Sequence, residues 1–407
     1  MFLLFEARIL GCSGHLGRAM SARTPFLIKM ITVECRDRTT CNILEIEWLL
    51  QMLPTRKILA VSWPLLLLAA CSGNSIADQP FFNPTKYHHT LDGFRNPPGS
   101  PENVRRPGRF FSFLWGRITE DNGPIKLPDN HILPSAEAIK QFHGSPTRSR
   151  ITWIGHASFL IGWNGVNILS DPHFSERSSP FSFAGPKRFT PPGLGIRDLP
   201  KIDVIIISHN HYDSFDENSL RALSKHSPDA IVLAPLGLAK TIKRWGFKNA
   251  RDMDWYDKHS LDDITFMSTP AIHRANRWLF DVNETLWSGF TIESNGKVIW
   301  FVGDTAMGPV FEQELAKRIA PVDITLTPVG AFLPREIMQA SHTTPEEAAY
   351  LAKMMGSKSA IGMHWGTFPL GEDHPLDAIV RFNQAPTPNV KKIMMKIGQT
   401  LDLRDLW

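Results

Sequence analysis

The sequence is poor in cysteine, and its few cysteines lie near the beginning. Four of the 407 residues are cysteine, namely Cys12, Cys35, Cys41 and Cys71. Because none follows Cys71, the rest of the chain contains neither a disulfide nor a cysteine-ligated zinc site. A metal bound there needs histidine, aspartate or glutamate as ligands.

An excess of charge is also lacking. The formal net charge is +4 at pH 7, from 44 Lys and Arg against 40 Asp and Glu, and no run of basic residues interleaves with aromatic residues. Nucleic acid is attracted by a strongly positive net charge or a local basic patch, and since the sequence has neither, we expect no nucleic-acid partner. The sequence also has no GxSxG motif, no P-loop and no dinucleotide fingerprint, so serine-nucleophile and nucleotide chemistries lack support.

Residues 52–71 have the pattern of a secretory signal. Two basic residues precede an apolar run, 58–68, that is short for a membrane span, and the segment ends in the sequence LAAC. It resembles a bacterial lipoprotein signal, whose cleavage leaves Cys71 as a lipid-modified N-terminus; a buried core helix is the alternative. We expect anchoring to a membrane of the bacterial cell envelope through Cys71, and Ser72 in place of an aspartate favours the periplasmic face of the outer membrane.

Residues 1–51 mix apolar and charged residues without a sustained period, and they precede a complete signal that begins at Met52. We hypothesise that translation starts at Met52 and that the first segment is a start-site artefact, with a disordered extension as the alternative. Peptides from 1–51 in mass spectra of the native protein would contradict this hypothesis.

Residues 72–149 are rich in proline, glycine and aromatic residues. Prolines at this density interrupt both helical and strand periodicity, so we expect an extended arm with one short helix at 135–142. Its aromatic side chains either pack on the body or line a lipophilic entrance.

Regular patterns begin at residue 150 and define a domain that reaches residue 407. Apolar segments such as RITWIGHASFLIGW, DVIIIS and KVIWFV predict strands, and helices are expected at 216–225, 237–246, VFEQELAKRI and TPEEAAYLAKMMG. Strands and helices alternate in two successive sets. This order predicts an α/β fold in which two sheets pack together with helices outside both.

Four predicted strands run into histidine or aspartate, in DVIIISHNH, TFMSTPAIH, VIWFVGD and SAIGMHWG. Sites in α/β sheets form where strands end in loops, so these side chains are expected to converge. One histidine at a strand end is more often a hydrogen-bonded structural residue, and the aspartate of GDT could cap a turn, but the combination indicates a metal site. Imidazole and carboxylate groups suit zinc. The expected ligands are His209, His211, Asp213, His273, Asp304 and His364.

The order HxHxD, His, GDT and HWG resembles the metallo-β-lactamase superfamily. Within it, TWIGHASFLI, LSDPHFSERSSP, GPKRF, LPKIDVIIISHNHYD, LWSGF, FVGDT, SHTTPEEA and MHWGTF resemble the N-acyl-phosphatidylethanolamine-hydrolysing phospholipase D family over about residues 150–370. The resemblance implies a four-layer αβ/βα sandwich with two zinc ions. By position, His209, His211 and His273 would hold the first ion, Asp213 and His364 the second, and Asp304 would bridge both.

The sequence departs from that family at Ser214, where a further ligand of the second zinc is expected. A serine hydroxyl is a poor zinc donor, so Asp213, Asp304, His364 and solvent would remain. Three protein ligands and a water are a usual catalytic set. We therefore expect a weaker or more open second site, and two tight zinc equivalents would contradict this.

The resemblance also implies roles around the metals. Tyr212 and His342 match positions that contact the substrate phosphate, although Tyr212 could simply pack and His342 could belong to the start of a helix. His156 and Asp171, with Ser214, are interpreted as groups behind the site that orient ligands, with ordinary structural hydrogen bonding as the alternative.

The implied function is a zinc-dependent phosphodiesterase of the phospholipase D type that acts on (N-acyl)phosphatidylethanolamine-like lipids. Zinc lowers the pKa of bound water from about 16 toward about 7, so a metal-bound hydroxide would attack phosphorus. Asp213 or Asp304 would accept a hydrogen bond from it, and His342 would hold the phosphate or the leaving group. The alternatives are hydrolysis of a lactone or another ester at the same site, and a non-catalytic envelope lipoprotein.

Overall fold

The computed structural model describes residues 33–37, 40–43, 81–102, 127–128, 130–144, 149–278 and 281–407. The chain divides into two compact units, 1–72 and 73–407. In the first, strands β1 (Val33–Asp37) and β2 (Thr40–Ile43) form an antiparallel pair. The predicted signal at 52–71, including Cys71, lies outside the described residues. Within the described part, no helix is both long and apolar enough to cross a membrane.

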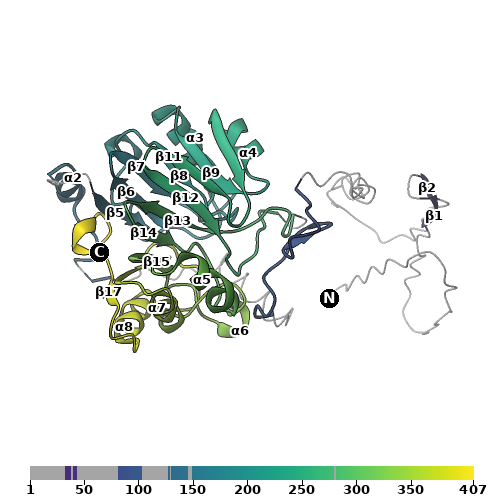
Figure 1. The fold of residues 1–407 in the computed structure, drawn as a ribbon. Coiled ribbons are helices and arrows are strands. Elements are labelled where there is room, and N and C mark those ends of the chain that lie inside the picture. Colours follow the sequence, from purple (N-terminus) through teal and green to yellow (C-terminus); the bar gives the residue numbers. More distant parts are fainter. Residues whose placement is uncertain are drawn as a thin grey trace, which may run out of the picture. The chain divides into compact units, whose positions relative to one another are not determined.

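The second unit contains two seven-stranded sheets (Figure 1). The first sheet has the order β10-β9-β8-β7-β6-β5-β18, parallel from β7 to β10 and antiparallel in the remainder. Its strands are β5 (Arg150–Gly155), β6 (Ser158–Trp163), β7 (Val166–Ser170), β8 (Val204–Ile206), β9 (Ile231–Pro235), β10 (Asn249–Met253) and β18 (Thr400–Asp402).

The second sheet has the order β11-β12-β13-β14-β15-β16-β17, antiparallel up to β14 and parallel from there. Its strands are β11 (Lys258–Leu261), β12 (Ile264–Thr269), β13 (Gly289–Ser294), β14 (Lys297–Phe301), β15 (Ile324–Pro328), β16 (Ser359–Met363) and β17 (Lys391–Ile393). The α-helices of the described residues are α2 (Ser135–Gly144), α3 (Glu217–His226), α4 (Ala239–Arg244), α5 (Ala316–Ile319), α6 (Arg335–Met338), α7 (Pro345–Met354) and α8 (Pro375–Gln384).

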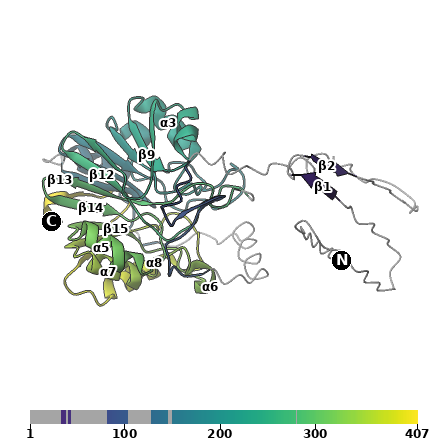
Figure 2. The same cartoon turned by 45° about the vertical axis from the view of Figure 1, so that its right-hand side comes forward.

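The two sheets lie face to face, with helices on both outer sides (Figures 1 and 2). Strand β8 shows why both faces of a sheet are covered. Val204 and Ile206 belong to the core between the sheets, whereas Ile205 packs in the core under α3 and α4. Side chains alternate across a strand, so a strand that is apolar at every position is buried on both faces. The expected four-layer αβ/βα sandwich is confirmed.

Helix boundaries follow local capping signals. Asp216 caps α3 by accepting a hydrogen bond from the backbone N of Ser219. Thr344 caps α7 by accepting from the backbone N of Glu347, while the Glu347 side chain accepts from the backbone N of Thr344. The predicted helix in VFEQELAKRI differs, because 311–315 is a π-helical turn that leads into α5. Helix α8, of ten residues, and the three-residue strands β17 and β18 were not predicted, and β18 forms only by pairing with distant β5.

Residues 81–102 of the predicted arm pack on the body, and the helix expected at 135–142 is α2. Within 81–102, strands β3 (His89–Thr90) and β4 (Gly93–Phe94) form a short antiparallel pair. Phe94 is buried in an apolar cluster with Trp255 and Trp287, and Tyr87 packs against the same cluster. Burial of these aromatic side chains ties the arm to the loops that follow β9, β10 and β12.

A buried carboxylate anchors the same segment. Asp254 Oδ1 accepts a hydrogen bond from His88 Nε2 at 2.7 Å, and Oδ2 accepts from His89 Nε2 at 2.8 Å and Lys86 Nζ at 2.6 Å. The backbone N of Asn83 donates to His89 Nδ1, so the His89 proton lies on Nε2. These two histidines and Asp254 have a metal-ligand composition. Because their facing atoms already pair with one another and with an ammonium group, we interpret the group as a structural anchor.

Candidate metal centre

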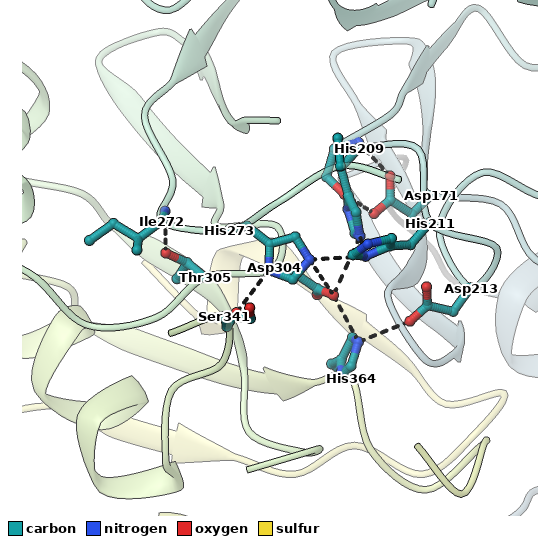
Figure 3. A network of polar contacts seen from close by, with 12 residues as sticks. Asp171, His209, His211, Asp213, Ile272, His273, Asp304, Thr305, Ser341 and His364 are labelled. Atoms are coloured by element: carbon teal, nitrogen blue, oxygen red, sulfur yellow. Dashed lines mark hydrogen bonds and ion pairs between the residues drawn. The ribbon is translucent and has the colours of Figure 1, made fainter. Parts of the chain in front are cut away.

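The six predicted ligand residues are brought together at one end of the sandwich (Figure 3). They follow four strands: three of them follow β8, and one each follows β12, β14 and β16. The turn after β14 depends on Gly303, whose φ is +68° and where a Cβ would lie 2.7 Å from the carbonyl oxygen of Ser288. A side chain at this position would displace the loop. The six residues are His209, His211, Asp213, His273, Asp304 and His364.

Three histidines direct ring nitrogens at one point. His211 Nδ1 lies 2.9 Å from His209 Nε2 and 3.1 Å from His273 Nε2. His209 and His273 are 1% exposed, so water does not screen these nitrogens. Three basic nitrogens at such distances repel one another unless a proton or a cation lies between them.

The outward-facing nitrogens show where the ring protons lie. His211 Nε2–H donates to Asn276 Oδ1 at 3.2 Å, and His273 Nδ1–H donates to the carbonyl oxygen of Ser341 at 2.9 Å. Both acceptors fix the proton on the far side of the ring, so the lone pairs of His211 Nδ1 and His273 Nε2 face inward. This arrangement suits a divalent cation.

Asp171 and Ser208 support His209 from behind. The backbone N and the hydroxyl of Ser208 both donate to the Asp171 carboxylate, and Ser208 Oγ lies 2.8 Å from His209 Nδ1. Burial raises the pKa of Asp171 well above its ordinary value, whereas the hydrogen bonds from Ser208 lower it. Asp171 therefore contacts His209 only through Ser208, as a group behind the site would.

The carboxylates occupy the other half of the centre. Asp304 Oδ2 lies 3.0 Å from His364 Nε2, 3.7 Å from His209 Nε2 and 3.9 Å from His273 Nε2, which places it between the two halves. Asp213 Oδ2 lies 3.2 Å from His364 Nε2. Asp304 thus faces ligand-type residues of both halves.

Charge in this half is strongly coupled. Burial opposes a positive charge on His364, but the carboxylates of Asp304 and Asp213 outweigh burial and raise the pKa of His364 to about 10. Burial also opposes ionisation of Asp213 and Asp304, yet neighbouring histidines hold both carboxyl pKa values well below the ordinary range. Two ionised carboxylates next to three inward-facing lone pairs form a donor set that fits divalent metal ions.

A pocket of about 280 Å³ opens over the centre. His342 lines it, with its ring centroid 5.3 Å from that of His273 and 5.2 Å from that of His364. Burial lowers the pKa of His342 to about 3, so its imidazole is neutral. Tyr212, Arg274 and Arg277 also line the pocket, together with apolar side chains that include Ile337, Met338 and Leu370. The pocket therefore offers a neutral hydrogen-bonding ring next to an apolar wall.

Several contributors were missed by reasoning from the sequence. Asn276 and Ser208 orient ligand histidines, and the carbonyl oxygen of Ser341 does the same. Arg277 Nη1 donates to the carbonyl oxygens of Asn210 at 2.9 Å and Phe215 at 2.7 Å. Asn276 and Arg277 follow His273 closely in AIHRANR, and this proximity to a predicted ligand was the feature of the sequence that could have indicated their roles.

Replacement of Arg277 by lysine is expected to loosen the loop that carries the first ligands. The guanidinium lies 3.9 Å over the ring of Tyr212 and makes two backbone hydrogen bonds, a geometry that an ammonium group does not reproduce. We expect a loss of about 1–3 kcal/mol in the free energy of unfolding, measured by urea denaturation. Arg404→Lys, at an exposed guanidinium paired with Asp402, is the control and should change little.

Comparisons with known proteins agree with this geometry. Residues 166–365 match a family described as the β-lactamase superfamily domain. N-acyl-phosphatidylethanolamine-hydrolyzing phospholipase D 1 of Caenorhabditis elegans is 32% identical over 307 residues, which are 72% of this chain and 85% of that protein. A metal-dependent hydrolase of Caldivirga maquilingensis is 28% identical over 256 residues, which are 62% of this chain and 97% of that protein.

Among solved structures, the isothiocyanate hydrolase from Delia radicum gut bacteria aligns with a TM-score of 0.50 at 20% identity, over 62% of this chain and 98% of that chain. This similarity shows the fold alone. The sequence similarity goes further, because it extends over most of the chain, and the family match over 166–365 spans the loops that carry the metal-binding groups. This protein is a metal-dependent hydrolase, and it belongs to the N-acyl-phosphatidylethanolamine-hydrolysing phospholipase D family of the metallo-β-lactamase superfamily.

Proposed function

We propose that this protein is a zinc-dependent phosphodiesterase of the phospholipase D type, acting on (N-acyl)phosphatidylethanolamine-like lipids. The observation that carries the proposal is the convergence of inward-facing imidazole lone pairs and two ionised carboxylates beneath a partly apolar pocket. Similarity to the phospholipase D of C. elegans supports the substrate class. Acyl chains of a lipid would suit the apolar wall.

The metal site would use the residues described above. His209, His211 and His273 would hold one zinc ion, Asp213 and His364 the other, and Asp304 both. Bound zinc would supply an activated water near neutral pH and would stabilise negative charge on phosphoryl oxygens.

The protein's own groups would position the substrate. The Asp213 carboxylate, ionised and buried, accepts a proton or a hydrogen bond from the attacking water. Neutral His342 donates a ring N–H to a phosphoryl oxygen or to the leaving oxygen. Burial raises the pKa of Tyr212, so its hydroxyl stays protonated and donates to the phosphate.

The substrate is tested with three assays on the full chain. N-acyl-phosphatidylethanolamine in mixed micelles, an acyl lactone and a β-lactam are each offered to zinc-loaded and zinc-stripped protein. We expect zinc-dependent release of phosphatidic acid and N-acylethanolamine from the lipid. Hydrolysis of the lactone alone would support the ester alternative, and no turnover with any divalent metal would support the non-catalytic lipoprotein.

Replacement of His342 by glutamine is expected to lower kcat about 100-fold, in the usual range for loss of an acid–base or hydrogen-bonding group. Zinc content should stay at the wild-type level if this residue acts on the substrate. Atomic emission of the purified variant measures that content alongside the lipid assay. A parallel loss of zinc and activity would assign His342 to the metal site instead.

Location is the second part of the proposal. A lipid on Cys71 would hold the enzyme on a bacterial envelope membrane, where its substrate resides, at the periplasmic face of the outer membrane. Cys71→Ser should leave the protein unlipidated and shift it from the membrane fraction. Membrane retention of this variant equal to wild type would contradict anchoring through Cys71.

A further inference from the structure

Ser214 does not act as a ligand in this fold. Its side chain is fully buried, and its hydroxyl lies near the Asp171 carboxylate, behind the site. The half of the centre formed by Asp213, Asp304 and His364 would thus have one protein donor fewer than the family resemblance implies. Another residue in this half is available to fill that place.

His156 lies against the same carboxylate oxygen as His364. Its Nε2 is 3.1 Å from Asp213 Oδ2, whereas His364 Nε2 is 3.2 Å from that oxygen. The two ring centroids are 4.2 Å apart, and both side chains are fully or almost fully buried. The potential ligand atoms of His156, Asp213 and His364 all lie within 4.8 Å of one another.

The backbone fixes His156 in this position. Its φ is +54°, a left-handed conformation that residues other than glycine adopt rarely. Its backbone N donates to Thr367 Oγ1 at 2.8 Å, and its carbonyl oxygen accepts from the backbone N of His364 at 3.1 Å and from Trp153 Nε1 at 3.0 Å. The loop with His364 therefore also holds His156, which sets the two imidazoles side by side.

We propose that His156 Nε2 is a ligand of the second metal ion and replaces the donor that Ser214 cannot supply. The second ion would then have four protein donors: Asp213, Asp304, His364 and His156. This number changes the expectation drawn from Ser214 alone, because the second ion should be held about as firmly as the first. The inference rests on the metal centre of the proposed function and not on its lipid substrate.

The competing role for His156 is that of an orienting group, in which Nε2–H donates to Asp213 without touching the metal. The two roles predict different responses to substitution. Loss of an orienting group weakens metal binding about 10- to 100-fold. A replacement side chain that keeps an N–H donor to Asp213 would maintain metal binding. A hydrogen-bond donor at this position does not compensate for the loss of a metal ligand.

The test is a zinc titration of the metal-stripped full chain against a competing chelator. The variants are His156→Asn, which tolerates the left-handed backbone, His156→Gln, which also offers an N–H, and His156→Asn with Ser214→His. His173→Asn is the matched control, because His173 is also buried and packs on Phe368, as His156 does. Proton NMR of the cobalt-substituted proteins counts the imidazole rings shifted by the metal. Circular dichroism verifies folding.

We expect the wild type and His173→Asn each to bind two equivalents of zinc tightly. Both single variants at position 156 should keep the first equivalent and weaken the second more than about 100-fold, with one shifted imidazole fewer. The added histidine at position 214 should restore the second equivalent. Wild-type binding by His156→Gln, an unchanged count of shifted imidazoles, or a weak second ion in the wild type would overturn the proposal. Failure of lipid hydrolysis with these metal results intact would remove only the proposed substrate.

Discussion

Asp304→Asn is expected to abolish turnover of the lipid substrate, with kcat/KM at least about 1,000-fold lower than in the wild type. Asp304 is 3% exposed, and its Oδ2 lies 3.0 Å from His364 Nε2 and 3.7 Å from His209 Nε2. It is the carboxylate that faces ligands of both halves of the centre. Asparagine keeps the shape but removes the negative charge that would hold two cations close together, so zinc content should also fall. Metal analysis and the lipid assay measure the two effects together.

Asp323→Asn is the matched control for this experiment. Asp323 is also a buried aspartate next to the second sheet, but it lies at the opposite ends of the strands, where it pairs with Lys297 and Lys358. Its replacement should lower stability and leave the zinc content unchanged. Full zinc content and wild-type turnover in Asp304→Asn would show that this carboxylate does not bridge the metals.

Asp254→Asn is expected to lower the free energy of unfolding by about 3 kcal/mol and to release the arm, 81–102. The Asp254 carboxylate accepts hydrogen bonds from buried His88 and His89 and from partly exposed Lys86. An amide in its place loses the charge and points an N–H group at one of these donors. Urea denaturation measures the stability, and limited proteolysis of the arm shows where it is lost.

The Asp254 carboxylate also makes the free energy of unfolding depend on pH. Burial opposes ionisation of Asp254, but the hydrogen bonds from His88 and Lys86 outweigh it and lower the pKa below the ordinary value. A carboxyl whose pKa is depressed in the folded state stabilises the protein above its unfolded pKa of about 4, and this contribution is lost as the pH falls further. The difference between wild type and Asp254→Asn should therefore be constant above about pH 5 and shrink in acid.

Asp262→Asn is the control for the arm. Asp262 lies in an exposed turn with φ +48°, a conformation that asparagine also adopts. Stability and proteolysis should match the wild type. Equal stability of Asp254→Asn and Asp262→Asn at pH 7 would show that the buried carboxylate does not anchor the arm.

Local sequence patterns predicted much of the fold. Strands β8 and β14 are apolar at nearly every position, and this pattern alone indicates burial on both faces of a sheet. Thr344 followed by Pro345 marked the start of α7 correctly, because capping is satisfied within one turn. Strand β18 escaped prediction, since its three residues become a strand only when they pair with β5 across the chain.

The chemical character of the centre was likewise encoded locally. His209, His211 and Asp213 alternate directly after a buried strand, so their spacing alone sends them in one direction. What each side chain meets there depends on distant segments. Asn276 lies opposite His211, the carbonyl oxygen of Ser341 opposite His273, and His156 lies against Asp213 although 57 residues separate them.

Local sequence patterns were sufficient to identify the residue types that could bind a metal, the strands that they follow, and the family to which the chain belongs. The packing of distant segments sets which nitrogens of His211 and His273 face inward and places Asp304 between the two halves. It also brings Ser214 near Asp171 and His156 against Asp213. The two kinds of information act over different distances along the chain. Spacing along one strand fixes the direction of a side chain, whereas the distance between the ends of different strands is set by the packing of the two sheets.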